Sequence, residues 1–127
     1  MSFTQQLALV TGAGSGIGRA TALLLAQLGA RVIITDRNSQ SLQETQALLQ
    51  QQGAQVYSEV ADVSDWQAMQ DLAARVHQQY GVLDILVNNA GVANSGEFLK
   101  TPIEDWNWVV SINLMGVVHG CKAFGGA

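Results

Sequence analysis

A glycine-dense turn between an apolar strand and the start of a helix constrains this chain more than any other feature. Leu7–Val10 is an apolar run of strand length, and Arg19–Ala26 has the composition of a helix. Between them lies Thr11-Gly12-Ala13-Gly14-Ser15-Gly16-Ile17-Gly18. Glycine lets backbone approach a ligand closely, and a helix N-terminus directs unpaired N–H groups toward the same point. The stretch therefore predicts an anion site suited to a pyrophosphate group.

The spacing of these glycines departs from the usual dinucleotide-binding pattern. G-x-G-x-x-G is not met, whereas Gly12, Gly16 and Gly18 form G-x-x-x-G-x-G. The alternative interpretation is a flexible glycine loop without a ligand. The flanking strand and helix count against that alternative, because a phosphate-binding turn requires both.

The length and the charge of the chain limit its class. With 127 residues, we expect one domain spanning 1–127. A net charge of −4 and a pI of about 4.8 argue against nucleic acid or an anionic membrane as the main partner. The single cysteine, Cys121, excludes an internal disulfide or a cysteine zinc site, and we expect no metal. With no visible signal peptide or membrane-length apolar run, we expect a cytoplasmic protein.

Strands that alternate with helices predict an α/β fold with a doubly wound parallel sheet of the Rossmann type. The expected strands are 7–10, 31–36, 55–60 and 82–87, and the four expected helices are about 16–28, 39–52, 64–80 and 101–124. Right-handed crossovers favour the strand order 3-2-1-4. In that order the loops after the first and fourth strands meet at the switch point, where such sheets bind ligands.

Two carboxylates follow strands at this edge. Asp36 ends the second expected strand, where it could accept hydrogen bonds from the adenosine ribose and repel a 2′-phosphate. Arg37 could instead pair with that phosphate, and Asp36 could simply cap the turn. Asp62 follows the third strand and could bond an adenine amino group, although aspartate in such a loop is most often a turn residue.

Taken together, these motifs resemble the short-chain dehydrogenase/reductase family in its classical form. The matching segments are Thr11–Gly18 (T-G-x-x-x-G-x-G), Asp62-Val63, Asn88-Asn89-Ala90-Gly91 (N-N-A-G) and Asn113 on the last expected helix. The resemblance runs from about Gln6 to Phe124. It implies an NAD(P)-dependent oxidoreductase that oxidises an alcohol or reduces a carbonyl, with NAD favoured over NADP because of Asp36.

The same resemblance implies a role for each site residue. The expected cofactor-binding residues are Gly12, Ser15, Gly16, Ile17, Gly18, Asp36, Arg37, Asp62, Val63, Asn89, Ala90, Gly91 and Val110. The first five surround the pyrophosphate, the next two border the adenosine ribose, and the pair after them holds the adenine. The last four line the path to the nicotinamide ribose. Asn113 is the only catalytic residue that can be placed, and it helps to hold a water in a proton relay.

The remainder of the family's catalytic set is missing from the sequence. In the family, a serine and a Y-x-x-x-K pair do the chemistry; the tyrosine is the acid/base and the lysine lowers its pKa. Here Tyr57 and Tyr80 are followed four residues later by Ala61 and Asp84. We therefore interpret the chain as the N-terminal, cofactor-binding half of a dehydrogenase, truncated relative to the family and inactive alone.

Two other functions stay open. A non-catalytic dinucleotide-binding module would also lack the tyrosine and lysine, and a methyltransferase would share the sheet, although N-N-A-G and Asn113 count against it. In the leading hypothesis the partner is a small alcohol or carbonyl substrate. A long apolar edge at Val82–Val87 and the wide apolar surface of the last helix predict a homo-oligomer.

Overall fold

A computed structural model describes residues 3–90, 103–104 and 115–124 of the chain. In these residues four strands form one parallel sheet in the order β3-β2-β1-β4, which confirms the predicted order. The strands are β1 (Leu7–Thr11), β2 (Arg31–Asp36), β3 (Val56–Val60) and β4 (Ile85–Val87).

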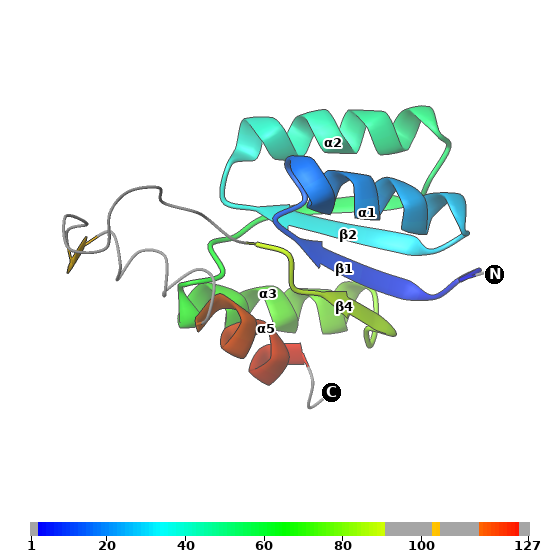
Figure 1. Cartoon of the computed structure of the whole chain (residues 1–127). Coiled ribbons are helices and arrows are strands. Elements are labelled where there is room, and N and C mark those ends of the chain that lie inside the picture. Colours follow the sequence, from blue (N-terminus) through cyan, green and yellow to red (C-terminus); the bar gives the residue numbers. More distant parts are fainter. Residues whose placement is uncertain (1–2, 91–102, 105–114, 125–127) are drawn as a thin grey trace.

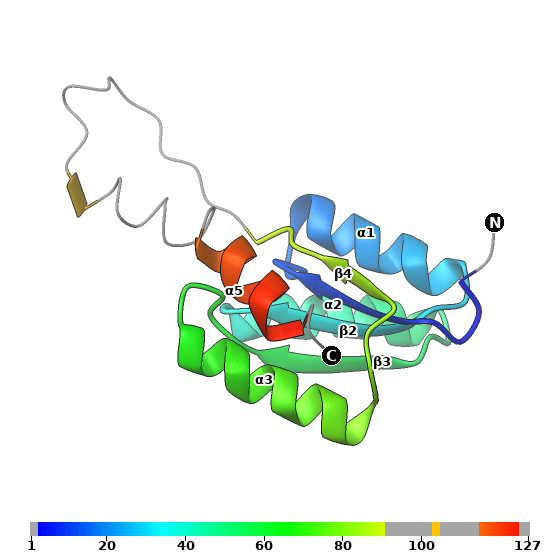
Figure 2. The same ribbon diagram turned by 90° about the horizontal axis from the view of Figure 1, so that it is seen from below.

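Helices cover both faces of this sheet. The helices of the described residues are α1 (Gly16–Gln27), α2 (Ser39–Gln51), α3 (Trp66–Gln79) and α5 (Gly116–Phe124). Figures 1 and 2 show α1 and α2 on one face and α3 and α5 on the other. The molecule thus has the three-layer architecture expected of a doubly wound sheet.

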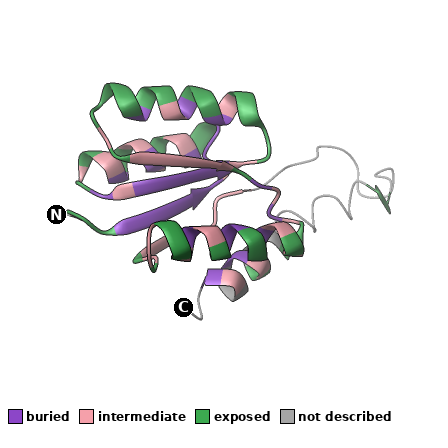
Figure 3. Cartoon of the chain, turned by 180° about the vertical axis from the view of Figure 1, so that it is seen from behind, coloured by how far each residue is buried: buried purple, intermediate pink, exposed green. Residues whose placement is uncertain are grey.

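Alternate residues of the central strands supply the two cores. Ala8 and Val10 pack with buried residues of α1 and α2, whereas Leu7 and Leu9 pack with α3 and with Phe124 of α5. All residues of β1 are buried, and Figure 3 shows burial concentrated on the central strands and on the inner sides of the helices. A strand covered on both faces reads as a continuous apolar run, which is the pattern seen in the sequence.

The register of the sheet brings the ends of three strands to one edge. Thr11 at the end of β1 pairs with Thr35 of β2, and Val10 pairs with Val87 of β4. Asp36 follows directly at the end of β2. The loops that leave β1, β2 and β4 therefore start side by side.

The fourth strand is shorter than predicted, because it begins at Ile85 and not at Val82. Asp84 explains the difference. Its carboxylate accepts a hydrogen bond from the backbone N–H of Leu7 at 2.8 Å, and its own N–H donates to the carbonyl of Leu7 at 2.8 Å. A side chain here takes the place of a ladder carbonyl, so regular pairing starts one residue later.

The start of the third helix and the end of the last helix can also be compared with the prediction. The third helix begins at Trp66, because Asp65 is its N-cap and accepts a hydrogen bond from Ala68 N–H at 3.1 Å. The helix therefore starts two residues after the expected residue 64. The last helix ends at Phe124 as predicted, whereas most of its expected earlier course lies outside the described residues.

Candidate functional site

The hydroxyl of Thr11 joins the two loops at the switch point. Thr11 Oγ1 accepts hydrogen bonds from the backbone N–H groups of Asn89, at 2.9 Å, and Ala90, at 3.0 Å. It also donates to the carbonyl of Val87 at 3.4 Å. The residue is buried. The first residue of the T-G motif therefore fixes the N-N-A-G loop against the end of β1.

Close packing between these loops requires glycine at two positions. A Cβ atom at Gly12, where φ is +63°, would lie 2.7 Å from Cα of Ala90. A Cβ atom at Gly18 would collide with the carbonyl of Gly12 and with the side-chain amide of Asn89. Either side chain would push the turn away from the sheet, so these glycines set the shape of the cradle.

The N-terminus of α1 opens beside this cradle. Ser15 is its N-cap, yet the side chain of Ser15 makes no capping hydrogen bond, and no acidic residue occupies the first turn. Ser15, Gly16 and Ile17 are exposed. The first N–H groups of a helix have no partner within the helix, so this end is suited to an anion.

Asp36 lies between the glycine turn and the start of α2. Its Oδ2 accepts a hydrogen bond from Gly14 N–H at 2.9 Å, and its Oδ1 accepts one from Asn38 N–H at 3.0 Å. The capping role considered as an alternative is thus present. Each carboxylate oxygen can accept more than one hydrogen bond, so this role leaves capacity for a ribose hydroxyl.

A polar pocket of about 310 Å³ connects these groups. It is lined by Gly12, Ser15, Asp36, Arg37, Asn38, Ser41, Ala61, Asp62, Val63, Asn89 and Ala90. Eight of these are predicted site residues. Gly16, Ile17 and Gly18 are in the adjacent turn but do not line the pocket, while Gly91, Val110 and Asn113 lie outside the described residues.

Three pocket residues were not predicted from the sequence, namely Asn38, Ser41 and Ala61. Asn38 caps α2 by accepting a hydrogen bond from Ser41 N–H at 3.0 Å, and Ala61 follows β3. The capping spacing from Asn38 to Ser41 directly after Asp36 was a usable signal, since it places a helix start at the same edge. Ala61 carries no chemical signal of its own.

The pocket wall formed by Asp62 and Val63 is held from two sides, by Ser64 in the same turn and by His119 of α5. Asp62 Oδ1 accepts hydrogen bonds from Ser64 N–H at 2.9 Å and from Ser64 Oγ at 2.7 Å, which is the turn role considered for it. On the other side, Nδ1 of His119 in α5 lies 2.8 Å from the carbonyl of Val63. The packing of α5 therefore reaches the pocket.

Neither tyrosine of the chain lines the pocket. Tyr57 and Tyr80 stack on each other with their ring centroids 4.1 Å apart. Burial, with smaller contributions from Glu59 and Tyr57, raises the pKa of Tyr80 above its ordinary value, which moves it away from acid/base work at neutral pH. In the described part of the chain, no cluster of His, Cys, Asp and Glu is arranged to hold a metal.

Comparison with known proteins identifies this arrangement. The family model for short chain dehydrogenases matches residues 6–125, nearly the whole sequence. The chain belongs to the short chain dehydrogenase family. The match confirms the resemblance seen in the motifs, and the members of this family are oxidoreductases. None of the helices in the described ranges is long and apolar enough to cross a membrane.

Individual members of the family match over part of their length. The probable oxidoreductase EphD of Mycobacterium tuberculosis is 48% identical over 123 residues, which cover 97% of this chain and 21% of EphD. A short-chain dehydrogenase/reductase from Burkholderia phymatum in complex with NAD is similar at a TM-score of 0.94 and 37% identity, covering 99% of this chain and 45% of that one.

Two further structures differ in the cofactor that they contain. An NAD+-bound xylitol dehydrogenase gives a TM-score of 0.95 at 34% identity, covering 99% of this chain and 49% of that one. A gluconate 5-dehydrogenase from Burkholderia cenocepacia, in complex with NADP and tartrate, gives 0.91 at 30% identity, covering 98% and 49%. The chain thus spans just under half the length of these short chain dehydrogenases.

Proposed function

We propose that this chain is the cofactor-binding part of an NAD-dependent oxidoreductase that oxidises an alcohol or reduces a carbonyl. The observation that carries the proposal is the polar pocket at the ends of β1, β2 and β4, which has the carboxylate of Asp36 in its wall. Similarity to short chain dehydrogenases in complex with NAD supports it. Because another similar structure is in complex with NADP, similarity alone does not select the cofactor. Asp36 and Arg37 would make that selection.

The pocket offers a distinct group for each part of a dinucleotide. The turn Gly12–Gly18 and the start of α1 would hold the pyrophosphate. Asp36 would accept the ribose hydroxyls, with Arg37 beside it, and Asp62-Val63 would hold the adenine. The nicotinamide part would be directed toward the reacting end by Asn89, Ala90, Gly91 and Val110. When bound, NAD supplies the acceptor for the hydride that leaves the alcohol carbon.

The chemistry needs groups beyond the pocket. An alcohol that loses a hydride must also lose its hydroxyl proton to a base, so that a carbonyl results. Asn113 would help to hold a water in that proton path, but neither Tyr57 nor Tyr80 lines the pocket. We therefore expect the 127-residue chain, folded as one domain, to bind cofactor without turning over a substrate. The whole protein would act on a small alcohol or carbonyl as a homo-oligomer.

Calorimetry and a turnover assay test this proposal together. The purified chain should bind NAD, and NADP about tenfold more weakly, because the carboxylate of Asp36 repels a 2′-phosphate. With NAD and a panel of secondary alcohols, it should produce no NADH above a blank without protein. Saturable turnover that survives repurification would contradict the expected inactivity, and absence of dinucleotide binding would contradict the function.

A non-catalytic dinucleotide-binding module is the second candidate, and the absence of either tyrosine from the pocket favours it. The coding sequence downstream of Ala127 distinguishes the two. A serine followed in frame by Y-x-x-x-K would support the oxidoreductase, and an in-frame stop would support the module.

A further inference from the structure

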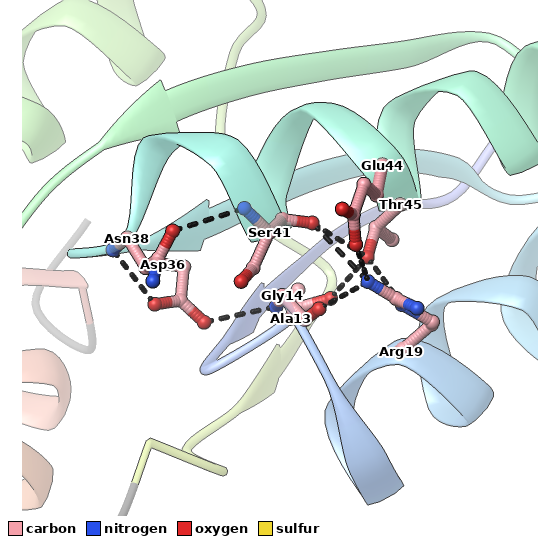
Figure 4. A network of polar contacts seen from close by, with 8 residues as sticks. All are labelled: Ala13, Gly14, Arg19, Asp36, Asn38, Ser41, Glu44 and Thr45. Carbon is pink, nitrogen blue, oxygen red and sulfur yellow. Dashed lines mark hydrogen bonds and ion pairs between the residues drawn. The ribbon is translucent and has the colours of Figure 1, made fainter.

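Arg19 joins the glycine turn to both neighbouring helices. It lies in the first turn of α1, and its side chain crosses to α2 (Figure 4). Nε donates to Thr45 Oγ1 at 2.8 Å, and Nη2 donates to the carbonyl of Gly14. The same Nη2 lies 3.3 Å from the carbonyl of Ser41 and 3.3 Å from Oε2 of Glu44.

Thr45 extends this contact to a second carbonyl of the turn. Its side chain is fully buried, and its hydroxyl accepts from Arg19 while donating to the carbonyl of Ala13 at 2.8 Å. Two consecutive carbonyls, those of Ala13 and Gly14, are therefore held by one guanidinium, directly and through the threonine hydroxyl.

The N–H side of Gly14 faces the carboxylate of Asp36, which would bind the ribose. The N–H of Gly14 donates to Asp36 Oδ2 at 2.9 Å. A Cβ atom on Gly14 would lie 2.7 Å from that oxygen and 2.8 Å from Cβ of Ser41, so the residue is tightly enclosed. Arg19 thus fixes the carbonyl of the residue whose N–H is bonded to Asp36 (Figure 4).

The stability of α1 gives no reason for a cation at this position. A positive charge in the first turn is unfavourable with respect to the helix dipole. The ion pair with Glu44 is open to solvent, with the glutamate side chain 59% exposed, and such pairs contribute little. Arg19 is also not among the residues that line the pocket, and its guanidinium contacts Thr45 and the carbonyl of Ser41 in α2.

We propose that Arg19 is a positioning residue for the cofactor: it fixes the distance between the glycine turn and the carboxylate of Asp36. This inference rests on the proposed function. A ligand that spans both parts, such as ADP, gains affinity only when the two parts are correctly spaced. Adenosine has no pyrophosphate, so it would contact the carboxylate of Asp36 without using the glycine turn. Its affinity should therefore not depend on that spacing.

Titration of the chain with ADP and with adenosine, followed by NMR, tests the proposal. Arg19→Ala should weaken ADP about tenfold or more and leave adenosine within about twofold. Arg19→Lys should recover only part of the loss, because one ammonium cannot reach Thr45 and two carbonyls together. Arg75→Ala is the matched control: its pair with Glu59, also at 3.3 Å, is on α3 at the other face, and ADP affinity should not change.

Two further measurements separate positioning from folding. Thr45→Val replaces the hydroxyl with a methyl group of similar size and should weaken ADP binding in the same selective way, whereas Thr45→Ser should not. In the ligand-free chain, Arg19→Ala should accelerate hydrogen exchange of the Gly14 amide and leave that of Leu9 in the core unchanged.

The outcomes distinguish this inference from the function on which it rests. Equal losses for ADP and adenosine, or full recovery with Arg19→Lys, would overturn the positioning role while the cofactor function stands. If the wild-type chain binds no ADP, the proposed function itself fails, and the positioning role fails with it.

Discussion

At the scale of single residues, Asp36 has two roles that a simple substitution would confuse. Its carboxylate faces the pocket, and it also binds the backbone N–H groups of Gly14 and Asn38. A variant that loses NAD affinity could have lost either role. The ratio of the NAD and NADP affinities separates them, because a loosened glycine turn should weaken both cofactors equally.

We expect Asp36→Asn to lower the preference for NAD over NADP about tenfold or more. The amide cannot repel a 2′-phosphate, and a hydrogen bond from a ribose hydroxyl to a charged acceptor contributes about 1.5–3 kcal/mol. Calorimetric titration with both cofactors measures the ratio. Thr45→Val is the control, since it should lower both affinities by a similar factor. An unchanged ratio in Asp36→Asn would show that another group, with Arg37 the first candidate, selects the cofactor.

The residues of the candidate site were predictable to the extent that each carries its own chemical signal. Glycines, Asp36 and the N-N-A-G segment have a spacing that points to one ligand. Thr45 has no such signal, because a threonine within a glutamine-rich helix reads as a surface residue, yet it is fully buried. Its role appears only once α2 is packed against the glycine turn. The partners of Arg19 were hidden for the same reason.

At the scale of elements, the hydroxyl of Thr11 connects the end of β1 to the loop that follows β4. Thr11 Oγ1 accepts two backbone hydrogen bonds from the N-N-A-G loop within a buried site. Thr11→Val keeps the shape of the side chain and leaves the Ala90 N–H without its acceptor, at a cost of about 1–3 kcal/mol, whereas the Asn89 N–H retains the carbonyl of Val87 at 3.1 Å. We expect the free energy of unfolding, measured with urea, to fall by about 1–3 kcal/mol.

Thr11→Ser provides the control for that prediction, because it retains the acceptor and loses only a methyl group. Its stability should lie much closer to the wild type. If Thr11→Val and Thr11→Ser were equally destabilised, packing of the methyl group, and not the hydrogen bonds of Asn89 and Ala90, would hold the loop.

Strand and helix boundaries followed the sequence wherever backbone pairing decides them and departed from it wherever a side chain takes over. The apolar run from Val82 suggested a six-residue strand, but the carboxylate of Asp84 captures the N–H of Leu7 and β4 starts at Ile85. Asp65, one residue after the expected helix start at Ser64, caps α3. Both aspartates were visible in the sequence, and their partners were not.

At the scale of the whole molecule, the strand order was predictable because handedness leaves few topologies for alternating strands and helices. The shape of the pocket was not, because it depends on how closely the glycine turn approaches Ala90 and Asp36. The outer surfaces were predictable only in part. Among the described residues, the shorter β4 leaves a shorter sheet edge than expected, and this shifts the argument for association toward α5.

We expect the chain to self-associate through the α5 surface. Val118 of α5 and Met115, which directly precedes α5, are 43% and 40% exposed, and burying a large apolar side chain contributes about 1.5–3 kcal/mol. In a symmetric dimer each substitution acts twice, so Val118→Lys should weaken association about a hundredfold. Sedimentation at micromolar concentrations measures this. Leu48→Lys is the matched control, because Leu48 is 37% exposed on α2 at the opposite face, and its change should leave association intact. A monodisperse wild-type monomer, or equal weakening by both substitutions, would mean that α5 is not the contact surface.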